Sequence, residues 1–109
     1  MHENYSRRGD LLTVKMPKEL DHHVASGLCT ELDFLIDSYG IRRLVFDFEN
    51  TEFMDSSGIG VIIGRTRNIG FFGGKTYAIH LNRQIRKIFH ASGLQRIVQT
   101  DGEKGAEHE

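Results

Sequence analysis

The sequence predicts an α/β fold: one small domain in which helices pack against a mixed sheet of four to five strands. Short apolar runs with strand-like composition alternate along the chain with amphipathic, helix-like segments, the order typical of layered α/β domains. A length of 109 residues suits a single hydrophobic core. We expect this core to span residues 4–99, and residues 100–109 to form a polar, flexible tail.

The first elements expected are strands. Residues 11–16 form an apolar run that reads as a strand, and we expect it to pair with a short strand near residues 4–8. Pro17 then ends the run, because proline has no backbone N–H to donate to a strand ladder.

A helix is predicted over residues 22–38. Asp21 is placed to cap its start, and Gly40 is placed to end it in the left-handed conformation that glycine adopts without strain. The apolar stripe of this helix combines side chains at helical spacing with others beside them: Val24, Ala25, Leu28, Cys29, Leu32, Leu35, Ile36 and Tyr39.

The middle of the chain predicts a central strand and a second helix. Residues 43–48 are almost continuously apolar, as expected for a strand buried on both faces. The helix expected over residues 57–68 contains Gly58, Gly60 and Gly64, each of which costs roughly 1 kcal/mol of helix propensity. Close approach of the helix to the sheet, or of a partner to the helix start, must offset this cost.

The last third predicts a strand, a short helix and a final strand. A strand over residues 76–80 follows a glycine-rich turn, and a helix over residues 83–91 places Ile85, Ile88 and Phe89 inward. Gly93 ends this helix. We expect Ile97 and Val98 to form the last short strand.

Composition points to a cytoplasmic protein. Cys29 is the only cysteine, so an intramolecular disulfide is impossible, and we expect its side chain to be a small core residue. No apolar stretch is long enough to span a membrane, and the first residues lack the pattern of a signal peptide. We therefore expect no membrane partner.

The net charge of −1 conceals a strong asymmetry. Residues 1–55 carry a balance of −5, residues 56–100 carry +7 with no acidic residue, and the segment from Asp101 carries −3. A basic half can indicate nucleic-acid binding, but these cations are spread over several predicted elements. Solvated helix faces are the preferred explanation, ahead of an acidic protein partner and of DNA or RNA.

The most informative segment is Phe-Met-Asp-Ser-Ser-Gly-Ile at residues 53–59. It places Asp55, Ser56 and Ser57 between an apolar run and a helix, so that the serines lie in the first helical turn. A helix start carries unpaired N–H groups and positive partial charge, which suit an anion. Asp55 and Ser56 also suit simple capping. The pattern favours a regulatory serine that a kinase can reach over a catalytic centre.

Several segments together resemble one known family. They are FMDSSGIGVIIGR at residues 53–65, ELDHH at residues 19–23, IRRLV at residues 41–45, and Ile88-Phe89 with Ser92-Gly93-Leu94. This pattern, which covers most of residues 11–98, resembles the anti-sigma factor antagonists of the SpoIIAA type, single-domain members of the STAS fold. The resemblance implies one STAS domain over residues 1–109. The family often has a further amphipathic C-terminal helix, whereas a polar segment follows Val98 here.

The resemblance also implies a function without catalysis or a cofactor. The unphosphorylated chain, a monomer when free, would bind a dimeric anti-sigma factor that is also a serine kinase and thereby free the sigma factor. The kinase would use ATP to phosphorylate Ser56, and a metal-dependent PP2C-type phosphatase would reverse the modification. The positions implied to contact the partner are Asp21, Asp55, Ser56, Ser57, Gly58, Ile59 and Gly60.

Other interpretations of these residues remain open. Ser57 is favoured as a structural serine, while Gly58 and Gly60 suit either tight packing or kinase access. His22 and His23 do not complete a metal site, because neighbouring residues on a helix diverge and no ligand set accompanies them.

Two other functional classes are conceivable. A serine hydrolase would combine Ser56 or Ser57 with an aspartate and His80 or His90, but the Gly-x-Ser-x-Gly elbow is absent. A nucleotide- or nucleic-acid-binding module would need a Walker motif or sheet aromatics, which are also missing.

Overall fold

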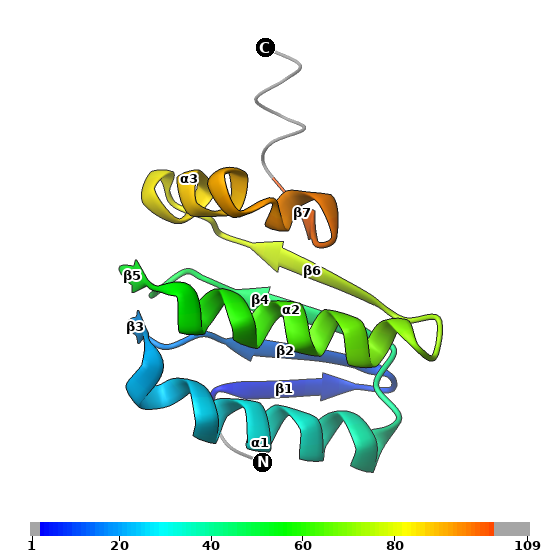
Figure 1. Cartoon of the computed structure of the whole chain (residues 1–109). Helices are drawn as coiled ribbons and strands as arrows, with labels where there is room; N and C mark the ends of the chain where they lie inside the picture. Colours follow the sequence, from blue (N-terminus) through cyan, green and yellow to red (C-terminus); the bar gives the residue numbers. More distant parts are fainter. Residues whose placement is uncertain (1–2, 102–109) are drawn as a thin grey trace.

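The structure, a computed structural model, describes residues 3–101 and contains one five-stranded sheet with the strand order β1-β2-β4-β6-β7 (Figure 1). The antiparallel edge strand β1 pairs with β2, and the other neighbours are parallel. A second, two-stranded pair joins β3 and β5. The strands are β1 (Tyr5–Arg8), β2 (Leu11–Lys15), β3 (Glu19–Leu20), β4 (Arg43–Asp47), β5 (Phe53–Met54), β6 (Lys75–Ile79) and β7 (Gln99–Thr100).

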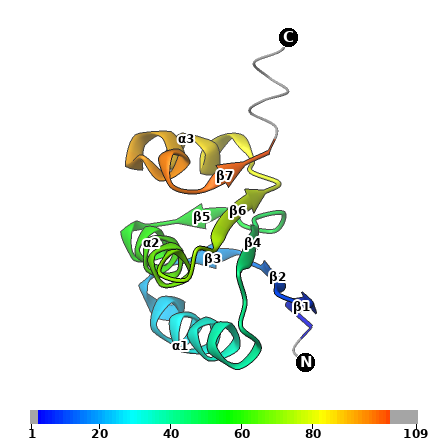
Figure 2. The ribbon, with the colours of Figure 1, turned by 90° about the vertical axis from the view of Figure 1, so that its right-hand side faces the viewer.

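The helices lie together on one side of this sheet (Figure 2). They are α1 (His22–Tyr39), α2 (Ser56–Gly70) and α3 (Arg83–Ser92), followed by a short 3-10 helix at Leu94–Arg96. This arrangement confirms the predicted α/β fold with a mixed sheet. None of the described helices is long and apolar enough to cross a membrane.

The core forms where the sheet meets the helices. Alternate residues of the central strands point inward and are fully buried, among them Leu12, Leu44 and Phe46. The prediction that the central strand is buried on both faces is wrong: Val45 is half-buried and Arg43 exposed on the opposite face. No described element covers that face, so its apolar residues are only partly shielded.

The predicted helix ends are confirmed by their capping geometry. The Asp21 side chain accepts a hydrogen bond from the His23 N–H, and Gly40 and Gly93 adopt left-handed conformations with φ of 59° and 83°. Within the α1 stripe, Leu32 and Ile36 are buried.

Other positions of the predicted helical stripes are less buried than expected. Val24 and Tyr39, at the two ends of the α1 stripe, are exposed. Ile88 of α3 is half-buried, whereas Ile85 and Phe89 lie in the core.

The two long helices are joined by an ion pair. The Arg65 Nε atom on α2 lies 2.8 Å from the Asp33 Oδ1 atom on α1, and the Arg65 side chain is 10 % exposed. The Asn68 side-chain amide donates a hydrogen bond to the same Asp33 oxygen at 3.0 Å. These contacts fix the position of α2 beside α1.

The predicted last strand is misplaced. Ile97 is exposed, and the chain joins the sheet only at Gln99, after the 3-10 turn over Leu94–Arg96. Val98 is buried but lies before this strand, so the predicted strand at Ile97 and Val98 is wrong. Most of the predicted polar tail, residues 102–109, lies outside the described residues.

Candidate functional site

A short parallel strand pair organises the candidate site. In this pair, Glu19 and Leu20 of β3 lie opposite Phe53 and Met54 of β5. The Asp55 N–H donates to the Leu20 carbonyl at 3.2 Å, which continues the pairing by one step. Asp21 and Asp55 therefore follow the two strands in the same register, and the helices α1 and α2 begin side by side.

Both aspartates act as N-caps. Asp21 Oδ1 accepts from the His23 N–H at 2.9 Å, and Asp55 Oδ1 accepts from the Ser57 and Gly58 N–H groups at 2.9 and 3.3 Å. A helix start offers unpaired amides to an anion. At α2, the Asp55 carboxylate already uses two of these amides.

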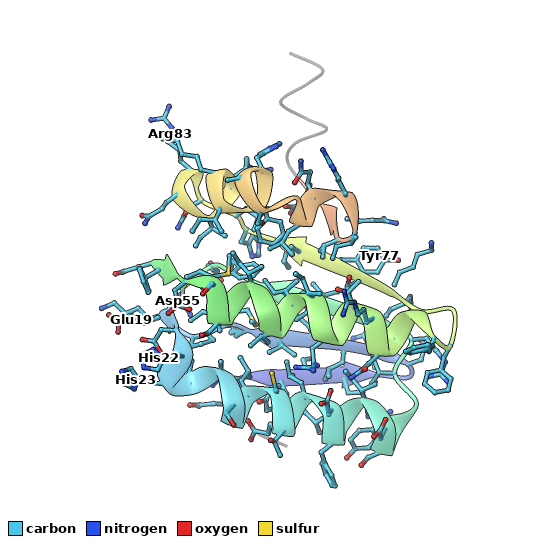
Figure 3. The ribbon with its side chains drawn as sticks, viewed as in Figure 1. Glu19, His22, His23, Asp55, Tyr77 and Arg83 are labelled. Atoms are coloured by element: carbon cyan, nitrogen blue, oxygen red, sulfur yellow. The ribbon has the colours of Figure 1, made fainter. Side chains whose placement is uncertain are left out.

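Ser56 is the first residue of α2, one residue before the predicted helix start. Its side chain is exposed, and its hydroxyl has no hydrogen-bond partner among residues 3–101. Figure 3 shows the neighbouring Asp55 at the same end of the molecule as Glu19, His22 and His23. The structure thus places the predicted phosphorylation site on the surface, beside the predicted contact Asp21.

The next four residues of α2 divide into packed and open positions. Gly58 is buried, and a Cβ atom there would lie 2.7 Å from both the Leu20 carbonyl oxygen and the Met54 side chain. Ser57 and Ile59 are half-buried. Gly60 is exposed, and a Cβ atom there would meet nothing within 4 Å. Tight packing therefore explains Gly58 but not Gly60.

The paired histidines at the start of α1 are exposed, and the expectation that their side chains diverge is wrong. The His22 and His23 rings are tilted against each other, with centroids 4.0 Å apart. Within the described part of the chain, neither belongs to a group of potential metal ligands.

A charged pair at the carboxyl ends of β4 and β6 was missed from the sequence. His80 Nδ1 lies 2.8 Å from Asp47 Oδ1, and this hydrogen bond raises the pKa of His80 above its ordinary value of 6.5, with the charges of Asp47, Glu49 and Asp101 adding to the effect. The potential ligand atoms of Asp47, Glu49 and His80 lie within 4.8 Å of one another.

The pair also has an unusual backbone. His80 has a φ of 60°, in the left-handed region that side chains other than glycine rarely adopt. The Asp47 side chain is almost buried. The two residues are 33 positions apart, so no local pattern indicated the contact.

The arrangement gives no support to a hydrolytic triad. Among the described residues, no hydrogen bond joins the hydroxyl of Ser56 or Ser57 to a histidine, and His80 is held by Asp47. A triad requires the nucleophile within hydrogen-bond reach of its base.

One exposed residue beside the site was overlooked. Phe53 on β5 is 46 % exposed, two residues before Asp55, while its neighbour Met54 is buried. The alternation of a strand places Phe53 on the outer side. Aromatic residues, Phe among them, are enriched at the cores of protein interfaces. The sequence signal for this exposed residue would have been an aromatic residue at the outward position of the two-residue strand β5.

Comparisons with known proteins show which family this chain resembles. The STAS domain model matches residues 4–105. The anti-sigma F factor antagonist of Paenibacillus polymyxa is 34 % identical over 88 residues, covering 81 % of this chain and 75 % of that relative. The corresponding antagonist of Lysinibacillus sphaericus is 29 % identical over 85 residues, or 78 % of this chain and 73 % of that relative.

Two solved structures share the fold. The anti-sigma factor antagonist SpoIIAA in its unphosphorylated form superposes with a TM-score of 0.80 at 27 % identity, covering 94 % of this chain and 90 % of that chain. The Bacillus cell fate determinant SpoIIAA in the phosphorylated form gives a TM-score of 0.72 at 27 % identity, with 95 % of each chain covered. The chain therefore belongs to the STAS domain family, and within it to the SpoIIAA-like anti-sigma factor antagonists.

Proposed function

We propose that this protein antagonises an anti-sigma factor, and that phosphorylation of Ser56 switches the interaction off. The observation that carries the proposal is the exposed Ser56 hydroxyl at the shared start of α1 and α2. Relatives named as anti-sigma F factor antagonists, and a SpoIIAA structure in a phosphorylated form, support it.

In this scheme, the chain is a cytoplasmic protein without catalytic activity and is a monomer when free. It binds a dimeric anti-sigma factor that is also a serine kinase, and the sigma factor is released. The partner binds the ATP that supplies the phosphoryl group, and a PP2C-type phosphatase restores the hydroxyl. The proposed contact surface comprises Asp21, Asp55, Ser56, Ser57, Gly58, Ile59 and Gly60, to which the geometry adds Phe53.

The capping geometry explains why a phosphate here would act on binding. Phosphorylation adds a charge of about −1.5 to −2. The Asp55 carboxylate already occupies the Ser57 and Gly58 amides, so the phosphate would meet a like charge at a helix start whose donors are in use. Against a docked protein, desolvation and repulsion of a few kcal/mol would weaken affinity by a factor of about a hundred or more.

The same geometry explains why the fold should persist. The Ser56 side chain is exposed and makes no hydrogen bond to the described residues, so its modification removes no internal contact. The positive end of the α2 dipole also partly compensates the added charge. Phosphorylation should therefore change the surface and leave the secondary structure intact.

The decisive experiment is incubation with the cognate kinase and ATP, followed by mass spectrometry of the peptides. We expect one phosphate on Ser56, none in a Ser56→Ala variant, and unchanged modification in a Ser57→Ala variant. Phosphate on another residue, or none with a kinase that is active on a control substrate, would refute the assignment.

A further inference from the structure

The end of the molecule opposite Ser56 carries an exposed aromatic pair. Phe71 and Phe72 follow the last turn of α2 and are 84 % and 65 % exposed. In Figure 1, the turn between α2 and β6 lies at the far end from β3 and β5. Because α2 has 15 residues, the helix separates this end from Ser56 by about 22 Å.

Cations lie on several elements at the same end of the molecule as the aromatic pair. In the strand register, Arg43 lies opposite Leu11 on one side and opposite Lys75 on the other. Leu11 is in turn paired with Arg8. The Arg42 guanidinium lies 4.8 Å from the centre of the Phe72 ring. Arg67 lies one helical turn before Phe71, whose N–H donates to the Arg67 carbonyl. We call these cations, together with Arg7, which precedes Arg8 on β1, the basic edge. It comprises Arg7, Arg8, Arg42, Arg43, Arg67 and Lys75.

Few acidic groups offset these charges. Asp10 forms an ion pair with Arg43 at 2.8 Å, and Asp37 is exposed at the end of α1. Asp33 lies nearby but is paired with Arg65, which is not part of the basic edge. The basic edge therefore has six cations against two carboxylates, whereas the rest of the chain has eight Lys and Arg against thirteen Asp and Glu.

We infer that the basic edge, with Phe71 and Phe72 at its tip, docks on the surface of an anionic lipid bilayer. Clustered Lys and Arg side chains are attracted to anionic headgroups, and Phe side chains beside them insert at the boundary between headgroups and acyl chains. Exposed phenyl rings beside clustered cations therefore fit both the charged headgroup layer and the apolar boundary beneath it.

A fluid bilayer fits this edge better than a folded protein partner does. The two phenyl rings project from a turn, and a protein would need a matched cavity for each of them, which complementary interfaces provide by close packing. Lipid headgroups and chains rearrange around a projecting ring without such a preformed cavity. The contact is peripheral and needs no membrane-spanning segment, so this inference departs from the expectation of no membrane partner, which rested on the lack of such a segment.

The test is sedimentation of the full chain with vesicles of phosphatidylcholine, prepared with or without an equal part of phosphatidylglycerol. We expect binding only to the vesicles that contain phosphatidylglycerol, with a loss of affinity at high salt. Replacing both Phe71 and Phe72 by Ser should weaken binding about tenfold or more, as should Lys75→Glu.

Matched variants separate the edge from general effects. Phe34 on α1 is 67 % exposed and lies outside the edge, so Phe34→Ser should bind like the unmodified chain. Lys87→Glu on α3 should do the same, apart from a small effect of net charge. Circular dichroism of each variant confirms that it folds.

Three outcomes would overturn the inference. They are absence of binding to the anionic vesicles, equal binding to vesicles without phosphatidylglycerol, and equal weakening by the control variants. Self-association that depends on Phe71, seen by analytical ultracentrifugation without vesicle binding, would instead assign this edge to contacts between copies of the chain.

Discussion

Asp21 and Asp55 each cap a helix, and they follow the paired strands β3 and β5 in the same register. This relationship brings the starts of α1 and α2 to one surface, where each dipole meets a carboxylate. Ser56 directly follows Asp55 and is exposed. A charge added at Ser56 therefore enters a surface that is already acidic, without entering the core.

The first prediction concerns a mimic of the phosphorylated state. Ser56→Asp should bind the anti-sigma partner at least about tenfold more weakly than Ser56→Ala, because the added carboxylate is repelled and desolvated in the interface. Isothermal titration calorimetry with the partner measures the difference. Ser38→Asp, at an exposed position near the other end of α1, is the control and should bind normally. Equal affinities of the two Ser56 variants would count against the switch.

The second prediction separates two glycines of α2. Gly58→Ala should destabilise the fold by about 1–2 kcal/mol, because the new methyl group meets the Leu20 carbonyl oxygen, which the Asp55 N–H already binds. Gly60→Ala should stabilise it by up to about 1 kcal/mol through helix propensity. Urea denaturation measures both changes.

The affinity for the anti-sigma partner tests whether Gly60 belongs to the proposed contact surface. We expect Gly60→Ala to bind more weakly despite its greater stability, because its methyl group projects from the contact surface. Gly64 lies one turn further along α2, and a Cβ atom there would also meet nothing within 4 Å. Gly64→Ala is therefore the matched control and should bind normally. Undiminished binding of Gly60→Ala would remove Gly60 from the proposed contact surface.

The third prediction separates the two roles of Asp55. Asp55→Ala should lower the free energy of unfolding by about 1 kcal/mol, since the Ser57 and Gly58 amides lose their acceptor. Asp55→Asn keeps an acceptor at the same place and should be nearly as stable as the unmodified chain. If Asp55→Asn also binds the partner normally, the carboxylate charge is not needed for recognition.

The fourth prediction concerns the pH dependence of stability. Because the Asp47 hydrogen bond raises the pKa of folded His80 above 6.5, protonated His80 stabilises the fold below about pH 6.5, and this contribution is lost as the pH rises through the folded pKa. Asp47→Asn should move the pKa of His80 back toward its ordinary value. Proton NMR titration of the imidazole measures the pKa, and urea denaturation across the same pH range measures the stability. A pKa that Asp47→Asn leaves unchanged would contradict this explanation.

Local signals predicted the elements that depend on a few neighbouring residues. Asp21, Gly40 and Gly93 mark helix ends through capping and left-handed backbone, which depend on residue type alone. The exposed Ser56 at a helix start followed from the same reasoning. These features are set within one or two turns of chain.

The features that the sequence analysis missed depend on distant contacts. The strands β3 and β5 have two residues each, too few to show a period, and their pairing joins segments more than thirty residues apart. The strand predicted at Ile97 and Val98 begins instead at Gln99, after a 3-10 turn whose Leu94 is buried in the core. Most cations of the basic edge lie on elements other than α2, namely β1, β4 and β6, so their position near Phe71 also depends on distant contacts.

The outermost strands of the sheet also bear on the solubility of the protein. Of the two edges, β7 is only two residues long, while β1 has Arg7 and Arg8 among its four residues. Short length and charge both discourage backbone pairing with another chain. Exchanging these arginines for valine or threonine would remove this protection and favour backbone pairing of β1 with the same strand of another copy.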